Sequence, residues 1–146
     1  MLLEELVATA EVPIADKVDL LLKVNSEAMK GGAKYISSNL FMINEQKYFA
    51  STDGSYIDQD IHRIWPTFTL TKTDAASGKF ETRNALSTPM GMGFEYLNPN
   101  EEEKIKGGPV TMYKKRYDIL EDVREAAVHV DEKLKAKPVA PGKYDL

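Results

Sequence analysis

The spacing of apolar residues changes twice along this chain, and that change constrains the fold more than any other feature of the sequence. Up to residue 32 and again after residue 118, apolar side chains recur at the spacing of one helix face. Between Ala33 and Met92 they recur at every second position, which is typical of β-strands. The order helix, strands, helix predicts an α+β fold: an antiparallel, hairpin-rich β-sheet flanked by an N-terminal and a C-terminal amphipathic helix.

Both predicted helices have recognisable ends. Gly31 and Gly32 are expected to end the first helix, because glycine adopts positive φ freely. Asp118 and Glu121 predict a capping box at the start of the second helix, in which each side chain satisfies an N–H group at the helix end. The expected buried stripes are Val18, Leu21, Leu22, Ala28 and Met29 in the first helix and Ile119, Leu120, Val123, Ala127, Val130 and Leu134 in the second.

The β-rich middle of the chain contains two turn signals and one break in the pattern. Residues 44–47 predict a turn, and Asp53-Gly54 predicts a hairpin with a type I′ turn, which needs positive φ. Near Pro66 the apolar residues move to the other face of the strand, which predicts an extra residue or a sharp bend. The expected strands are residues 35–43, 48–50, 56–72 and 80–86.

Composition narrows the class of protein. The 146 residues are 42% hydrophobic and 29% charged, which predicts a single globular domain over residues 1–146. A net charge of −4 argues against nucleic acid as a partner, and Lys114-Lys115-Arg116 is interpreted as a solvated approach to the second helix. Residues 98–109 are expected to form a mobile acidic loop. Without a long apolar run or a visible signal peptide, we expect no membrane partner and a cytoplasmic location.

Asp58, Asp60 and His62 are the most suggestive candidates for chemistry. They alternate along one predicted strand, so their side chains are expected on one face within a few ångströms of each other. Two carboxylates and an imidazole are suited to binding a divalent metal or to pairing a base with its orienting acid. A water-facing strand whose opposite face carries Ile57 and Ile61 explains the same residues, and we favour that interpretation.

The remaining candidates are weaker. His129 lies on the second predicted helix between two valines and is interpreted as a structural imidazole. The glycines of Met90-Gly91-Met92-Gly93-Phe94 do not match a phosphate-binding pattern and predict a bend at a sheet edge. No serine lies in a nucleophile elbow, and cysteine is absent from the sequence. The residues themselves therefore predict no catalytic, cofactor-binding or metal site.

Three stretches of the chain, taken in order, resemble the N-terminal region of the TldD/PmbA family, described as modulators of DNA gyrase and grouped with metallopeptidases. Residues 39–70 are similar to a strand pair joined by an Asn-Ser-Asp-Gly-like hairpin, with Thr52 in place of the usual asparagine or serine. Residues 91–97 are similar to a glycine-rich segment of the family. Residues 120–146 are similar to the helix, proline-containing linker and first strand that precede the catalytic half.

The resemblance implies that the catalytic residues lie in a later part of the protein. In the family, a later helix with a His-Glu-x-x-x-His motif and a later cysteine hold zinc, and no residue of this chain matches those ligands. The chain is therefore expected to be the non-catalytic N-terminal domain of a zinc metallopeptidase, truncated before the metal-binding half. Zinc and a peptide substrate would belong to the full-length parent, and a homo- or hetero-oligomer is implied. On this view Tyr144-Asp145-Leu146 begins a strand that continues into that half.

Two questions stay open at the level of sequence. A free-standing α+β protein-binding or dimerisation module without enzymatic activity accounts for the same pattern. Trp65 is interpreted as a core residue, with the alternative that its strand is covered by helices on one face and by a partner or second domain on the other.

Overall fold

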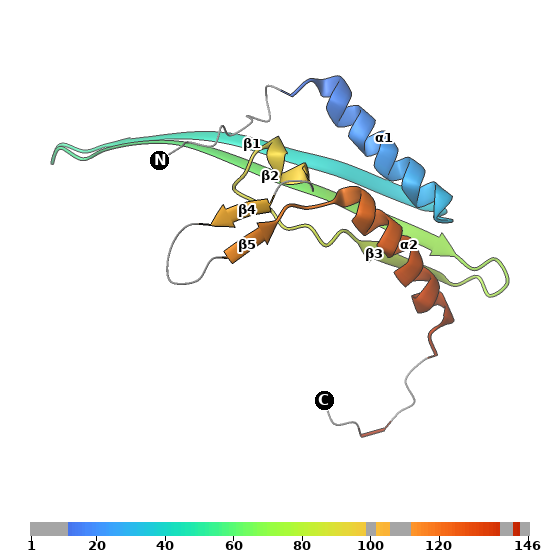
Figure 1. Cartoon of the computed structure of the whole chain (residues 1–146). Helices are drawn as coiled ribbons and strands as arrows, with labels where there is room; N and C mark the ends of the chain where they lie inside the picture. Colours follow the sequence, from blue (N-terminus) through green and yellow to red (C-terminus); the bar gives the residue numbers. More distant parts are fainter. Residues whose placement is uncertain (1–11, 99–101, 106–111, 138–141, 144–146) are drawn as a thin grey trace.

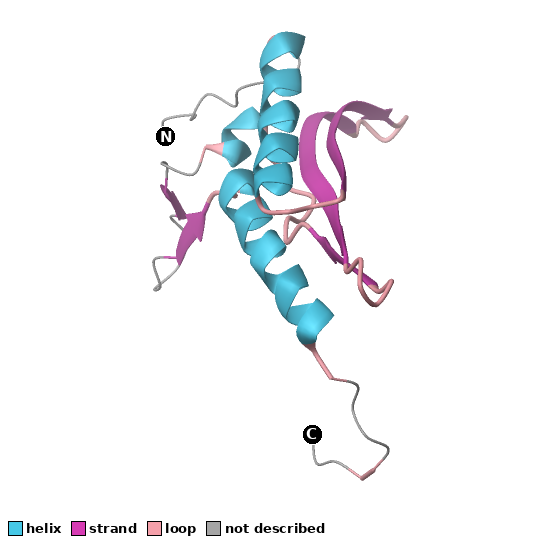
Figure 2. Cartoon of the chain, turned by 90° about the vertical axis from the view of Figure 1, so that its right-hand side faces the viewer, coloured by secondary structure: helices cyan, strands magenta, loops and turns pink. Residues whose placement is uncertain are grey.

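The computed structural model describes residues 12–98, 102–105, 112–137 and 142–143, and it confirms the α+β class. Two helices pack against the same face of a three-stranded antiparallel sheet of order β1-β2-β3, and no helix of the described residues lies on the opposite face (Figures 1 and 2). Residues 1–11 and the strand expected to begin at residues 144–146 lie outside the described residues. The elements are α1 (Ile14–Lys30), β1 (Tyr35–Ala50), β2 (Tyr56–Thr73), β3 (Phe80–Asn84), the 3₁₀ helix η1 (Phe94–Leu97), β4 (Glu102–Ile105), β5 (Met112–Lys115) and α2 (Ile119–Lys135).

β1 and β2 form one long, regular hairpin. Every residue from Tyr35 to Ala50 is paired with β2, so the turn predicted at residues 44–47 is wrong. Polar residues there do not interrupt the strand, because each of them has a partner residue on β2. The hairpin at Asp53-Gly54 is confirmed, but the turn is not type I′. Only Gly54 has positive φ, and its N–H donates to the carbonyl of Ser51 at 3.1 Å, which is the geometry of a three-residue loop with a glycine bulge.

Pro66 causes neither a bulge nor a bend in the pairing, so that prediction is also wrong. The register between β1 and β2 is constant on both sides of the Pro66–Leu40 pair. On the side away from β1, Ile64 exchanges two backbone hydrogen bonds with Met90, and the carbonyl of Phe68 accepts from the N–H of Ala85. Backbone groups alternate in direction along a strand, so the missing N–H of Pro66 also faces away from β1. The proline therefore removes no hydrogen bond from the hairpin.

The core lies between the helices and one half of the sheet. Phe68 and Leu70 of β2 pack with Val24 of α1 and Val123 of α2, and all four side chains are almost fully buried. The stripe predicted for α2 is confirmed, with Leu120 and Leu134 at its partly buried margins. Asp118 accepts hydrogen bonds from the N–H groups of Leu120 and Glu121, both at 3.0 Å, as expected of the N-terminal cap.

The stripe predicted for α1 is correct only in part. Val18, Leu22 and Met29 are exposed, and the buried face instead centres on Val24 and Ala28. α1 has apolar residues on more than one side, and its neighbours decide which side is covered. Spacing alone could not identify the covered side.

The two glycines after α1 serve different purposes. Gly32 has φ of +86°, the left-handed conformation expected at a helix end. Gly31 has ordinary φ, but a Cβ atom there would lie 2.6 Å from the Cβ of Ala127 on α2. Gly31 therefore permits the close approach of the two helices, which the sequence did not predict.

Segments expected to be irregular contain further structure. Glu102–Ile105, within the predicted acidic loop, pairs with Met112–Lys115 as a two-stranded antiparallel sheet. Lys114 and Lys115 belong to β5, and Arg116 is buried with 9% exposure, so the solvated interpretation is wrong for Arg116. The guanidinium of Arg116 donates to the backbone carbonyl of Glu95 at 2.7 Å, which connects this segment to η1.

An ion pair joins the two helices and gives stability a defined pH dependence. The carboxylate of Glu27 accepts from Lys30 and from Arg124 of α2, each at 2.8 Å. These hydrogen bonds, Lys30 first, lower the pKa of Glu27 from 4.5 to about 2. A lowered pKa means that the contribution is complete above pH 4.5 and is lost as the pH falls toward 2.

We predict that thermal stability depends less on pH in Glu27→Gln than in the wild type. The difference between the two melting temperatures should be constant above pH 4.5 and shrink between pH 4.5 and 2, as measured by circular dichroism. Glu132→Gln, at an exposed position of the same helix as Arg124, is the control and should follow the wild type. A melting-temperature difference that grows on acidification would contradict a stabilising ion pair at Glu27.

Candidate interaction surface

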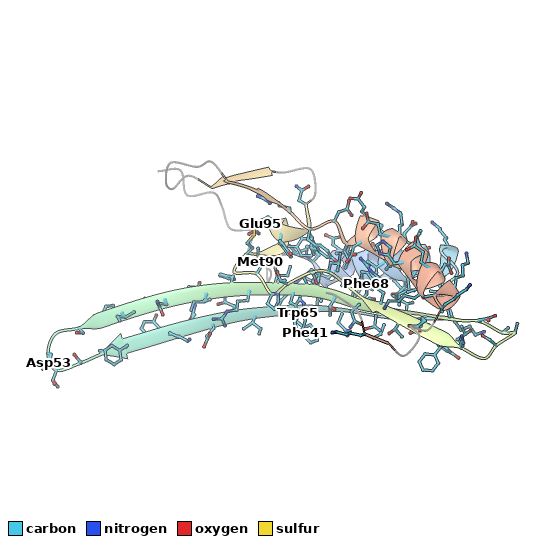
Figure 3. The ribbon with its side chains drawn as sticks, turned by 90° about the horizontal axis from the view of Figure 1, so that it is seen from below. Phe41, Asp53, Trp65, Phe68, Met90 and Glu95 are labelled. Atoms are coloured by element: carbon cyan, nitrogen blue, oxygen red, sulfur yellow. The ribbon has the colours of Figure 1, made fainter. Side chains whose placement is uncertain are left out.

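The hairpin is longer than the helices that cover it. β1 has 16 residues and α1 and α2 have 17 each, so the strand spans about 53 Å and each helix about 25 Å. The distal part of the hairpin, ending at the turn with Asp53, projects beyond both helices (Figures 1 and 3). It is held by pairing within the hairpin, and neither α1 nor α2 covers either of its faces.

The sheet face away from the helices carries a row of apolar side chains. Phe41 and Trp65 are a cross-strand pair with ring centroids 5.6 Å apart, and 50% and 40% of their surfaces are exposed. Figure 3 shows both rings on the side of the hairpin opposite Phe68. Trp65 is therefore not a core residue. We call this row the outer strip, and its members are Phe41, Ile43, Phe49, Ile57, Ile61 and Trp65.

Charged residues beside the outer strip, on the same face of the hairpin, are paired with one another. The carboxylate of Glu45 lies 3.0 Å from the guanidinium of Arg63 on β2 and 3.1 Å from the ammonium of Lys47. These contacts, Lys47 first, lower the pKa of Glu45 below its usual value. An apolar surface of this kind with its charges already compensated is suited to contact with another protein surface.

The exposed edge of β1 is a second feature of the same hairpin. β1 is an outer strand of its sheet, and no described strand pairs with its other side. Its 16 residues contain no proline, and its pairing contains no bulge. Natural edge strands are usually short or carry such interruptions, because an open row of N–H and C=O groups attracts other strands.

Asp58, Asp60 and His62 lie on one face of β2, as predicted, but they do not form a cluster. Successive side chains on a strand face are about 7 Å apart, which places Asp58 and His62 about 13 Å apart along β2. Only one contact forms, 3.5 Å between His62 Nε2 and an oxygen of Asp60. Among the described residues, no three potential ligands come together as a metal site. The expectation that all three lie within a few ångströms is wrong.

The two other candidates from the sequence are His129 and the glycine-rich segment at residues 90–94, and the structure describes both. His129 is exposed on α2. Met90 pairs with Ile64 as an isolated bridge, which agrees with the predicted bend at a sheet edge. The N–H of Gly93 donates to the side chain of Glu95 at 2.7 Å, at the start of η1.

A buried polar network beside α2 was not predicted from the sequence. Asp122, only 6% exposed, lies 2.8 Å from the guanidinium of Arg83 and accepts from the hydroxyl of Tyr117 at 2.5 Å and the N–H of Leu86 at 2.8 Å. Asp122 appeared to be an ordinary acidic residue in the first turn of a helix, so no sequence signal marked it.

The network borders an open hollow of about 310 Å³ but has the properties of a structural anchor. Tyr96 and Tyr117 are stacked there, 5.9 Å between ring centroids. Burial, and then the hydrogen bond to Asp122, raise the pKa of Tyr117, so its phenol stays protonated. The phenol of Tyr117 is therefore not a base, and the carboxylate of Asp122 is held by Arg83, Tyr117 and Leu86. The hollow is lined by Leu86, Tyr96, Arg116, Tyr117, Asp118, Glu121, Asp122 and Glu125.

Comparisons with known proteins identify no relative. Neither protein-family models, nor curated proteins, nor solved structures give a match to this chain. Among the described residues, no helix is both long and apolar enough to cross a membrane.

Proposed function

We propose that this chain is the non-catalytic N-terminal domain of a TldD/PmbA-like zinc metallopeptidase and contributes substrate enclosure and dimer assembly. Zinc and the catalytic residues belong, in this proposal, to the half that the resemblance places after residue 146. A cytoplasmic location is part of the same proposal. The observation that carries it is the outer strip on a hairpin that projects beyond its own core.

The outer strip supports a docking role for physical reasons. Exposed apolar side chains gain free energy when a partner covers them, at about 25 cal/mol for each Å² removed from water. Trp and Phe are among the residues that contribute most at protein interfaces, and Phe41 and Trp65 lie next to each other. We assign the outer strip to contact with the zinc-bearing half, which would close one wall of a chamber around a peptide.

The only tryptophan of the chain provides the test. In the longer encoded protein we expect the emission of Trp65 to lie at shorter wavelength, and to be quenched less by acrylamide, than in the 146-residue chain. Spectra of Trp65→Phe are subtracted to remove other tryptophans. Trp65→Ala should weaken docking of the two halves roughly tenfold or more. Leu22→Ala, an exposed apolar residue on α1, is the matched control.

Three results would contradict the proposal. One is a reading frame that ends at residue 146, or that continues without a His-Glu-x-x-x-His helix. Another is identical Trp65 emission and quenching in the two forms. The third is stoichiometric zinc or peptide hydrolysis in the 146-residue chain itself.

A second candidate is supported by the same surface. A free-standing dimerisation or protein-binding module would also need an apolar strip and an open strand edge. It predicts that the encoded protein stops near residue 146 and still associates with a partner. The reading frame therefore separates the two candidates.

A further inference from the structure

We infer that the free edge of β1 pairs with the same edge of a second copy of this chain, antiparallel and centred on Gln46. The two three-stranded sheets then become one continuous sheet across a two-fold axis. The inference rests on the proposed role in dimer assembly and deepens it, because it names the partner and the register.

The hydrogen bonds on the side of β2 away from β1 show in which direction the N–H and C=O groups of each residue of β1 and β2 point. Ile64 and Phe68 bond away from β1, so the odd-numbered residues of β2 bond toward it. Their partners on β1 are also odd-numbered, as in the pair Phe41–Trp65. The even-numbered residues of β1 therefore direct their N–H and C=O groups outward. In the projecting part of the strand these residues are Met42, Asn44, Gln46, Tyr48 and Ala50.

One register of self-pairing satisfies both the backbone and the side chains. With Gln46 opposite Gln46 of the second copy, the outward-facing groups of residues 42–50 meet in hydrogen-bonded pairs. Glu45 then lies opposite Lys47 of the second copy, and Lys47 opposite its Glu45. Ile43 lies opposite Phe49 in the same way. These are the non-hydrogen-bonded positions, where side chains of facing strands are closest.

Neighbouring registers are disfavoured by charge and by geometry. Sliding the second copy along β1 by two residues in one direction places Glu45 opposite Glu45 of that copy. Sliding it by two residues in the other direction places Lys47 opposite its Lys47. Like charges directly opposite each other are destabilising. A shift by one residue sets inward-bonding residues against outward-bonding ones and leaves backbone groups unpaired. Of these neighbouring registers, only the one centred on Gln46 places Glu45 opposite Lys47.

The pairing also leaves the helices undisturbed. It involves residues 42–50 only, whereas α1 is attached farther back, where the hydroxyl of Ser38 donates to the side chain of Asn25 at 2.7 Å. A bound peptide of unrelated sequence would gain the same backbone bonds but not the reciprocal Glu45–Lys47 and Ile43–Phe49 contacts. The observations therefore favour a second copy over an extended peptide.

A single cysteine tests the register, since the chain has none of its own. Gln46→Cys places two thiols opposite each other, within the Cα separation that a disulfide spans. Asn44→Cys is the matched control: it is exposed on the same face, but it lies opposite position 48. Under mild oxidation at equal concentration, we expect Gln46→Cys to form the disulfide dimer roughly tenfold faster than Asn44→Cys.

Charge reversal gives an independent measurement that does not need oxidation. Lys47→Glu replaces two attractive cross-strand pairs with two repulsive ones, and we expect it to weaken self-association roughly tenfold in analytical ultracentrifugation. Lys23→Glu changes the net charge equally at an exposed position of α1 and should leave association unchanged. Circular dichroism verifies that each variant is folded.

The outcomes separate this inference from the proposed function. Fast cross-linking of Gln46→Cys together with weakening by Lys47→Glu supports the inference. A dimer that cross-links equally at positions 44 and 46, or that tolerates Lys47→Glu, overturns the edge pairing and leaves the docking role of Trp65 intact. A chain that stays monomeric at all concentrations overturns the pairing, while the Trp65 emission test still decides the proposed function.

Discussion

Phe68→Ala is expected to lower the free energy of unfolding by about 3–5 kcal/mol, the largest effect of any single truncation of an apolar side chain in this sheet. Phe68 is 1% exposed and is the largest fully buried side chain of the described residues. It packs in the cluster that joins β2 to both helices, with Val24 on one side and Val123 on the other. Truncation removes its transfer free energy and leaves a cavity that the helices can fill only in part.

Urea denaturation followed by circular dichroism measures this loss. Phe80→Ala is the matched control, since Phe80 has the same side chain on the neighbouring strand but is 67% exposed. It should change stability by no more than about 0.5 kcal/mol. Equal losses for the two variants would show that the core does not lie between β2 and the helices.

Asp122→Ala is expected to lower the free energy of unfolding by about 3–5 kcal/mol, for an electrostatic reason. The substitution leaves the guanidinium of Arg83, whose side chain is 10% exposed, without the carboxylate 2.8 Å away. It also removes the acceptor of the Tyr117 hydroxyl and of the Leu86 N–H. Breaking one side of a buried ion pair costs more than the pair contributes, because the remaining charge stays desolvated.

Two further variants separate charge from packing at Asp122. The pair Arg83→Met and Asp122→Leu removes both charges and should recover most of the stability lost in Asp122→Ala. Glu132→Ala, at an exposed position on the same helix, should lie within about 0.5 kcal/mol of the wild type. A loss below about 1 kcal/mol for Asp122→Ala would mean that Arg83 finds another partner, contrary to the network described above.

The fold was predictable where local chemistry decides it. The cap at Asp118, the left-handed Gly32 and the Asp53-Gly54 hairpin each follow from the preferences of a few adjacent residues. The predictions that failed needed distant information. Residues 44–47 look like a turn in isolation, yet they form part of a strand because each of them has a partner residue on β2.

The candidate surface was predictable only in outline. Alternation placed Trp65 on the face opposite Phe68, which is correct, but a residue with an apolar side chain was expected in the core. Asp122 was not singled out, because its partners Arg83 and Leu86 lie more than thirty residues earlier in the chain. A contact between such distant residues has no local pattern from which to infer it.

The sequence by itself determined the order of the two helices and the place of the hairpin between them, because apolar spacing separates helix from strand and Asp53-Gly54 marks the turn. The structure decided the register, because the loop is a three-residue glycine bulge and not the predicted type I′ turn. Only the tertiary structure decided which face is covered and how far. Two helices of about 25 Å can cover about half of a hairpin of about 53 Å, and they settle where Val24 and Val123 meet Phe68. The other half, with its outer strip and open edge, is left exposed because no described helix extends far enough to cover it.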